Sequence, residues 1–98
     1  MNYWGKTYAT QEDLVVAICD DNLIDKEIVD KEIKIKVSRN FYGGMYITEG
    51  IALKLLNKAT IGNLIGEKIV DIAEKNGFIT KENIIFINGI PHAQFVKI

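Results

Sequence analysis

The sequence is poor in the residues that cross-link small proteins or bind metals in them: its 98 residues include one cysteine, one proline and one histidine. A single cysteine, Cys19, excludes an internal disulfide and a zinc site built on two thiolates, and it favours a reducing compartment such as the cytoplasm. With His92 as the only histidine, a zinc site would have to rely on carboxylates, which zinc seldom uses alone. We therefore expect no bound metal.

An excess of charge of one sign is also lacking, because 12 basic residues face 13 acidic ones and leave a formal net charge of −1. This balance gives no global attraction to nucleic acid or to anionic lipid, so any such binding would depend on a local patch. No apolar run approaches the roughly 18 residues that span a bilayer. The first eight residues lack the basic start and apolar core of a signal peptide. The sequence predicts a soluble cytoplasmic protein with no membrane partner.

Familiar enzyme motifs are missing as well. The sequence contains no phosphate-binding loop, dinucleotide fingerprint or nucleophile elbow, and it has no pair of histidines at metal-binding spacing. We therefore expect no cofactor, and no residue is assigned a catalytic role.

What is present is the composition of an ordinary globular protein, 48% hydrophobic and 26% charged, which predicts one domain over residues 1–98. Tyr3–Tyr8 and the apolar run Leu14–Cys19 predict a hairpin whose second strand is central, because an unbroken apolar run is typical of a strand buried on both faces. Residues 23–31 show no clear period and are interpreted as irregular, or as a single helical turn. Glu32–Ser38 alternates strictly and predicts a half-exposed strand with lysines on its wet face, as suits a sheet edge.

Two helices are predicted in the second half. Thr48 can cap the first, which has an apolar stripe at helical spacing formed by Ala52, Leu55, Leu56 and Ala59. The second is predicted from about Thr60 to Asn76, with Gly77 ending it. On this helix Gly62 and Gly66 would lie on a flat ridge of small residues against which a neighbouring element packs closely. Leu64 would fall on its polar side.

The end of the chain predicts a second hairpin, because Asn88-Gly89 between apolar runs is the strongest short-range signal for a tight turn. Pro91 restricts the following strand to a sheet edge or to a position near its start. The order of elements, hairpin, strand, two helices and C-terminal hairpin, predicts a single α+β domain with helices packed on a largely antiparallel sheet.

Four groups of residues are candidates for binding. The segment Phe41, Tyr42, Gly43, Gly44 could stack a base or grip a peptide, or could be a turn filled by core aromatics. Near it, Lys34, Lys36 and Arg39 could form a small nucleic-acid-binding face, or a solvated edge.

The other candidates lie farther along the chain. Thr60 and Asn63, with Glu67 a turn later, could hold an anion at a helix start, or could be a cap and its helix. His92 and Gln94 share one face of a strand, where the imidazole could bind or titrate, or could be satisfied by backbone. Cys19 is interpreted as an inert core thiol.

Together, the segments Phe41-Tyr42-Gly43-Gly44, Ala59-Thr60-Ile61-Gly62-Asn63-Leu64-Ile65-Gly66-Glu67 and Gly89-Ile90-Pro91-His92-Ala93-Gln94 resemble the signatures of an archaeal family catalogued as domain of unknown function 424. Cys19-Asp20 and the length fit the same pattern. The resemblance implies an archaeal, cytoplasmic protein. It marks Thr60, Asn63, Glu67, His92 and Gln94 as motif positions but assigns none of them a role.

Two functional hypotheses follow. The first is a non-catalytic binding module associated with RNA or with a ribosome-associated protein. The second is a small-molecule or anion site, with or without enzymatic activity, between the Thr60 helix start and His92 with Gln94. A homodimer formed through the last strand or through Leu64 is a further alternative.

Overall fold

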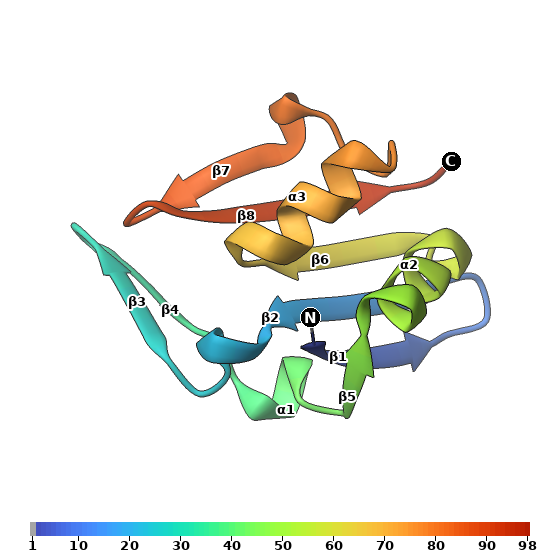
Figure 1. Cartoon of the computed structure of the whole chain (residues 1–98), viewed down its shortest axis with the longest axis horizontal. Coiled ribbons are helices and arrows are strands. Elements are labelled where there is room, and N and C mark those ends of the chain that lie inside the picture. The colour runs from blue at the N-terminus through green and yellow to red at the C-terminus, as the bar shows by residue number, and fades with distance from the viewer. Residues whose placement is uncertain (1) are drawn as a thin grey trace.

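The computed structural model describes residues 2–98, and Figure 1 shows the arrangement of their elements. The strands are β1 (Asn2–Ala9), β2 (Leu14–Asp20), β3 (Glu27–Asp30), β4 (Ile33–Lys36), β5 (Met45–Thr48), β6 (Ile61–Ile65), β7 (Ile84–Ile87) and β8 (Ile90–Val96). The helices are α1 (Arg39–Tyr42), α2 (Glu49–Lys58) and α3 (Glu67–Lys75), with short 3-10 turns η1 (Asp21–Leu23) and η2 (Lys81–Asn83). The predicted α+β class is confirmed.

Six strands form the main sheet in the order β5-β1-β2-β6-β8-β7, and β3 and β4 form a separate two-stranded sheet. Every neighbouring pair in the main sheet is antiparallel except β2 and β6, which run parallel. The apolar run of β2 lies between β1 and β6, and its residues Val16, Ala17, Ile18 and Cys19 are fully buried. The prediction of a central second strand is therefore confirmed.

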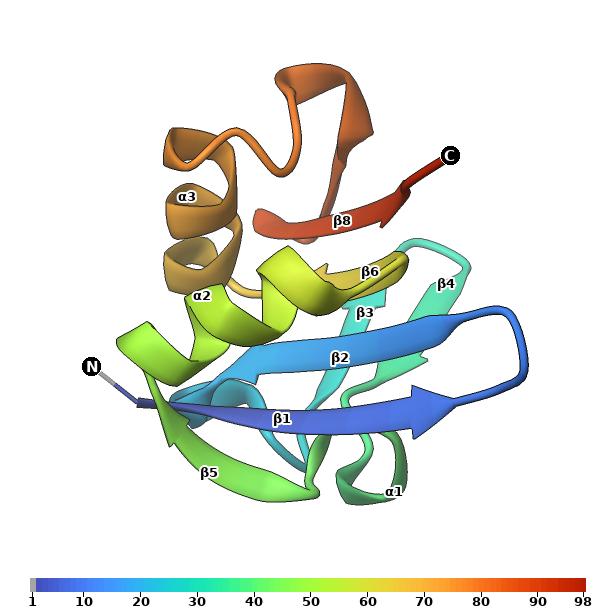
Figure 2. The ribbon, with the colours of Figure 1, turned by 90° about the vertical axis from the view of Figure 1, so that its right-hand side faces the viewer.

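Each face of the sheet has its own core. Figure 2 shows from the side the elements that cover the two faces. On one face, α2 and α3 bury Ile18, Leu56, Leu64 and Ile69. On the opposite face, the β3–β4 hairpin and α1 bury Cys19, Tyr42, Ile65 and Ile87. The β3–β4 hairpin and α1 do not extend over the whole of this face, so part of it stays open.

Other confirmed predictions rest on short-range signals in the sequence. The Thr48 hydroxyl accepts a hydrogen bond from the N–H of Ile51, which makes Thr48 the predicted N-cap of α2. Asn88 and Gly89 have φ values of 49° and 77°, as the predicted tight turn requires. Pro91 occupies the second position of β8. Strand β8 is an inner strand of the sheet. Of the two placements predicted for Pro91, a sheet edge or a position near the start of its strand, the second is therefore right.

The helix predicted from Thr60 to Asn76 is wrong in its first part. Ile61–Ile65 forms strand β6, and α3 begins only at Glu67. Gly66 lies between them with a φ of 125°, a value that ends the strand and that side chains rarely tolerate. The glycine ridge does not exist, and Leu64 is fully buried in the core instead of facing solvent.

The interpretation of residues 23–31 as irregular also needs correction, because Glu27–Asp30 forms β3 and pairs with β4. The strand predicted at residues 32–38 is shorter than expected, Ile33–Lys36. Ile33 is 56% exposed while Val37 is buried, so only the root of this hairpin packs on the sheet. Within residues 2–98, no helix has the length and apolar character needed to cross a membrane.

Candidate functional site

The open part of the sheet carries a strip of uncharged side chains from β2, β6 and β8. The register pairs Val15 with Ile61, Ile61 with Val96, and Asn63 with Gln94. Because side chains alternate along a strand, these residues and His92 all point to the face opposite α2 and α3. We call this set the uncharged strip: Val15, Ile61, Asn63, His92, Gln94 and Val96.

The strip borders the covered core at a short hydrogen-bond network. The hydroxyl of Tyr42, from α1, donates to Asn63 Oδ1 at 2.5 Å. His92 Nε2 lies 3.3 Å from the same oxygen. A carbonyl oxygen can only accept, so Nε2 carries the imidazole proton and Nδ1 is left as an acceptor. The sheet thus joins three predicted candidates that lie far apart in the sequence.

The strip retains unused hydrogen-bonding capacity. Across residues 2–98, the side-chain NH2 of Asn63 and the side-chain amide of Gln94 have no protein partner, and Gln94 contributes only its backbone carbonyl to Asn83. Asn63 and His92 are half-buried and Gln94 is exposed. A ligand lying on the strip would therefore meet donors and acceptors set among apolar side chains.

His92 is neutral at physiological pH because burial lowers its pKa below the ordinary value of 6.5. Below pH 6.5 the unfolded chain then binds a proton more readily than the folded one does. We expect the free energy of unfolding to fall as the pH drops from 7 toward the pKa of the folded state, and His92→Gln to remove that part of the dependence. Urea titrations of both proteins across this pH range test the sign. A proton NMR titration that gives an imidazole pKa above 6.5 would contradict it.

The aromatic segment at α1 is mostly used for packing. Phe41 stacks on Tyr8 with ring centroids 5.6 Å apart and meets Tyr42 edge-on at 4.9 Å. Gly43 ends α1, and a Cβ there would lie 2.7 Å from the Arg39 carbonyl oxygen. A Cβ on Gly44 would lie 3.1 Å from the carbonyl oxygen of Gly5. Both glycines therefore let the chain turn tightly against its neighbours.

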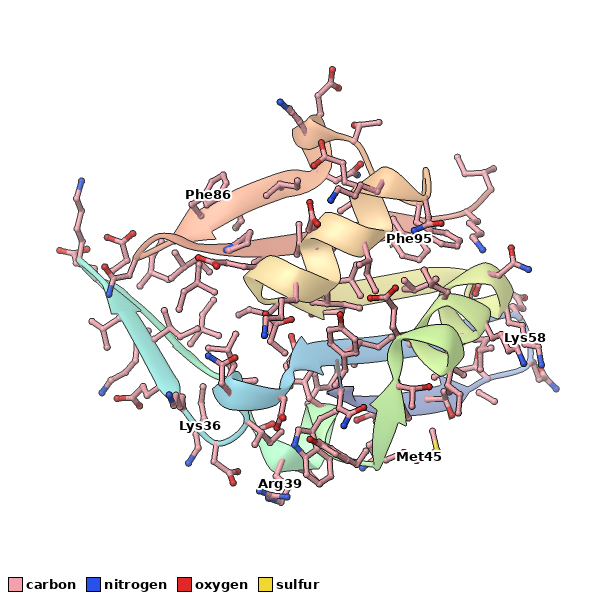
Figure 3. All side chains as sticks on the ribbon, viewed as in Figure 1. Lys36, Arg39, Met45, Lys58, Phe86 and Phe95 are labelled. Carbon is pink, nitrogen blue, oxygen red and sulfur yellow. The ribbon has the colours of Figure 1, made fainter. Side chains whose placement is uncertain are left out.

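The basic candidates are partly neutralised by neighbouring acids. Arg39 forms an ion pair with Asp25, with Nη2 2.7 Å from Oδ2, and its guanidinium carbon lies 5.0 Å from the centre of the Trp4 ring. Lys34 lies 3.7 Å from Glu27 across the hairpin, and both side chains are exposed. Lys36 makes no ion pair with any residue from 2 to 98. Figure 3 shows Lys36 and Arg39 together at the lower margin of the molecule.

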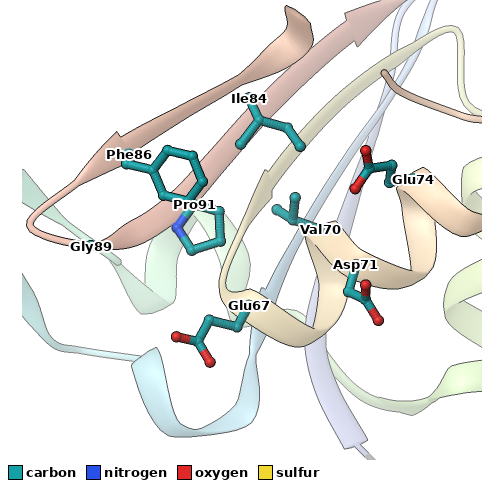
Figure 4. Close-up of a pocket in the computed structure, with 8 residues that line it drawn as sticks. All are labelled: Glu67, Val70, Asp71, Glu74, Ile84, Phe86, Gly89 and Pro91. Carbon is teal, nitrogen blue, oxygen red and sulfur yellow. The ribbon is translucent and has the colours of Figure 1, made fainter. Parts of the chain in front are cut away.

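Thr60 and Glu67 do not join His92, which corrects the predicted anion site. Thr60 follows α2 and precedes a strand. Its hydroxyl donates a hydrogen bond to Asp13 Oδ1 at 3.0 Å and accepts one from the N–H of Leu14 at 2.8 Å. Glu67 lies on the helical side of the sheet, beside a shallow pocket of about 230 Å³ that also borders Phe86 and Pro91. Figure 4 shows the carboxylates of α3 on one wall of this pocket and Phe86 on the other.

A residue that the sequence did not single out for a role is Asp20, at the end of β2. Its buried carboxylate accepts hydrogen bonds from the backbone N–H groups of Lys68 at 2.9 Å and Ile69 at 2.8 Å, and so caps α3. Burial nevertheless raises its pKa. The only local signal for this arrangement is Gly66, which has no side chain with which to cap its own helix.

Its neighbour Cys19 is fully buried, and burial raises the pKa of the thiol to about 12. The nucleophilic thiolate is therefore nearly absent at neutral pH, in line with the interpretation of Cys19 as a core residue.

The fold and strip define a small α+β protein with an open, uncharged sheet face. Residues 8–98 match the model of the family described as Protein of unknown function (DUF424). The chain belongs to this family, which confirms the resemblance seen in its motifs. No curated protein matches the sequence.

The fold is similar to that of a solved structure described as the crystal structure of an uncharacterized conserved protein from Methanopyrus kandleri. The TM-score is 0.82 and the sequence identity 22%, over 100% of this chain and 95% of that chain. At this identity the likeness concerns the fold alone.

Proposed function

We propose that the chain is a non-catalytic binding module and that the uncharged strip docks a protein partner. The observation that carries this proposal is the convergence of Asn63, His92 and Gln94, with free hydrogen-bonding groups, on an open apolar part of the sheet. A partner segment that presents backbone amides and apolar side chains matches these groups. Association would also cover Val96, which is 67% exposed.

The absence of charge favours protein over nucleic acid. The centres of protein interfaces are depleted in charged residues, whereas nucleic-acid sites rely on lysine and arginine beside the phosphates. None of the six side chains of the strip is charged at neutral pH, because His92 is held neutral by burial. The cations of the sequence-predicted RNA face, Lys34, Lys36 and Arg39, lie on the β3–β4 hairpin and on α1, outside the strip.

The arrangement around His92 supports binding over catalysis. Its partner is the neutral amide of Asn63, and in the described part of the chain no carboxylate hydrogen-bonds to the imidazole. General bases in enzymes are commonly oriented and activated by a carboxylate. The buried thiol of Cys19 supplies no nucleophile.

The experiment compares three immobilised proteins exposed to a lysate of the source organism. The site variant is Gln94→Asp with Val96→Asp, two exposed positions where a carboxylate leaves the core untouched. The matched control is Lys34→Ala with Lys36→Ala on the hairpin. We expect wild type and control to retain the same protein, and the site variant to lose it by about tenfold or more, equivalent to about 1.4 kcal/mol.

RNA is the second candidate, favoured by the unpaired Lys36 and by the half-buried Tyr8–Phe41 stack beside α1. Nuclease treatment of the lysate and direct titration with transfer and ribosomal RNA separate the two. Salt-sensitive RNA binding that disappears in the Lys34→Ala, Lys36→Ala protein would replace the protein-docking proposal. Retention of every partner by the Gln94→Asp, Val96→Asp protein would refute the role of the strip.

A further inference from the structure

The outer strand β7 lacks the usual protection of a sheet edge. Its sequence, Ile84-Ile85-Phe86-Ile87, has no charge and no proline, and its partner on one side only is β8. Ile85 is 57% exposed on one face of the sheet and Phe86 is 66% exposed on the other. Figure 3 shows Phe86 on this outermost strand. Exposed edges of this kind normally carry lysine, proline or a bulge, because they otherwise pair with other chains.

The hydrogen-bond pattern shows which backbone groups of β7 are available. Phe86 lies opposite Pro91 in the register, and the carbonyl of Pro91 accepts from the N–H of Gly66, on the β6 side. In an antiparallel strand the N–H and C=O of one residue point the same way. Pro91 therefore directs its backbone away from Phe86, so Phe86 must point its own N–H and C=O outward. Two residues away, Ile84 also points its C=O outward, but its N–H already donates to the carbonyl oxygen of Lys81.

The opposite edge of the sheet is better protected. On β5, Tyr46 is 52% exposed, but its hydroxyl donates to Asp21 at 2.7 Å and its ring packs on Trp4 at 5.1 Å. The β3–β4 hairpin carries Glu27, Lys34 and Lys36 on its exposed side. Among the strands at the margins of the two sheets, β7 therefore combines apolar side chains on both faces with unpaired backbone groups.

We propose that β7 is a dimerisation edge, at which two copies of the chain pair antiparallel about a two-fold axis. The axis passes through Ile85, so that Ile84 of each copy lies opposite Phe86 of the second copy. In this register the N–H of Phe86 in each copy donates to the carbonyl oxygen of Ile84 in the second copy, and each side chain stays on its proper face of the joined sheet. A shift by one residue would bring opposite faces together.

A second copy fits this edge because the strand is complementary to itself. Ile84 and Phe86 face each other in both halves of the pair, and the two Ile85 side chains meet on the other face. The residues flanking the strand, Asn83 and Asn88, are uncharged, and the register places Asn83 opposite Ile87 of the second copy. A two-fold pairing of one edge with itself also closes, whereas pairing β7 with β5 would continue into a filament.

Analytical ultracentrifugation over micromolar to millimolar concentrations tests the proposal on the full chain. We expect a monomer–dimer equilibrium with no larger species. Phe86→Lys should shift the dissociation constant upward by at least tenfold, whereas Met45→Lys, a matched apolar-to-charged change on the β5 edge, should leave it unchanged.

Phe86→Pro gives a sharper test, since it removes an outward N–H that the β7–β8 ladder does not use. We expect a folded monomer, recognised by an unchanged circular dichroism spectrum. Hydrogen exchange should show slower exchange of the Phe86 amide as the wild-type concentration rises. A wild type that stays monomeric throughout, a dimer indifferent to Phe86→Lys, or growth into polymers would each overturn the proposal.

Discussion

Replacing Asp20 by alanine is expected to lower the free energy of unfolding by about 2–4 kcal/mol, the largest effect of any single change considered. The substitution leaves the buried N–H of Ile69 and the partly buried N–H of Lys68 without an acceptor, and an unpaired buried group costs about 1–3 kcal/mol. It also removes the only side-chain cap of α3, because Gly66 has none. Removing a carboxylate whose pKa is raised by burial offsets part of this loss.

The measurement is urea unfolding followed by circular dichroism, with the slope checked for constancy so that the change reflects stability alone. In a domain of this size each kcal/mol also lowers the melting temperature by about 4–8 °C. Asp21→Ala is the matched control: its carboxylate is exposed and accepts from Tyr46, so a loss within about 1 kcal/mol is expected. Equal stabilities of the two variants would show that Asp20 does not hold α3.

Asp20→Asn separates charge from hydrogen bonding. The amide keeps one acceptor oxygen in nearly the same volume, so it can satisfy one N–H of α3 but must present its own NH2 group to the other. We expect an intermediate loss of stability, and faster hydrogen exchange at one of the two amides, Lys68 or Ile69.

The elements that the sequence predicted correctly are those with local signals. The hairpin at Asn88-Gly89 follows from two residues that tolerate positive φ, and α2 follows from the Thr48 cap with an apolar stripe behind it. The unbroken apolar run of β2 identified a strand buried on both faces, because neither face shows alternation.

The same physics explains why β6 was mistaken for a helix. Strand β6 carries apolar residues on both faces, with Leu64 in one core and Ile65 in the other, so it shows no period of two, and its apolar residues continue at helical spacing into α3. Only Gly66 separates the two elements. A helix boundary that depends on one glycine with positive φ and on an aspartate 48 residues before Lys68 cannot be recognised from neighbouring residues.

The candidate site was predictable in its members but not in their arrangement. His92 and Gln94 were correctly placed on one strand face, whereas Asn63 was assigned to a helix beside Glu67. The antiparallel register of β6 and β8 instead pairs Asn63 with Gln94 and leaves Glu67 on the other side of the sheet. Register between strands that lie about thirty residues apart depends on the whole sheet, and short motifs do not contain it.

Gly62→Ala is expected to destabilise the protein by about 1–3 kcal/mol through overpacking. A Cβ at this position would lie 2.1 Å from Cε2 of Phe95, whereas carbon atoms pack at about 3.5–4.0 Å. The ring cannot simply swing away, because Phe95 is 6% exposed and stacks on Phe78 with centroids 6.4 Å apart. The entropy gained by replacing glycine in a strand, about 0.5–1 kcal/mol, is smaller than this strain.

Two further proteins decide whether Phe95 is the cause. Gly50→Ala is the control, since a Cβ there meets nothing within 4 Å in helix α2, and it should stabilise the protein by up to about 1 kcal/mol. In a Phe95→Leu background the added methyl has room, so Gly62→Ala should cost much less than in the wild type, which a double-mutant cycle of urea unfolding measures directly. A cost that is the same in both backgrounds would mean that the glycine serves the backbone of β6 and not the aromatic ring that covers it.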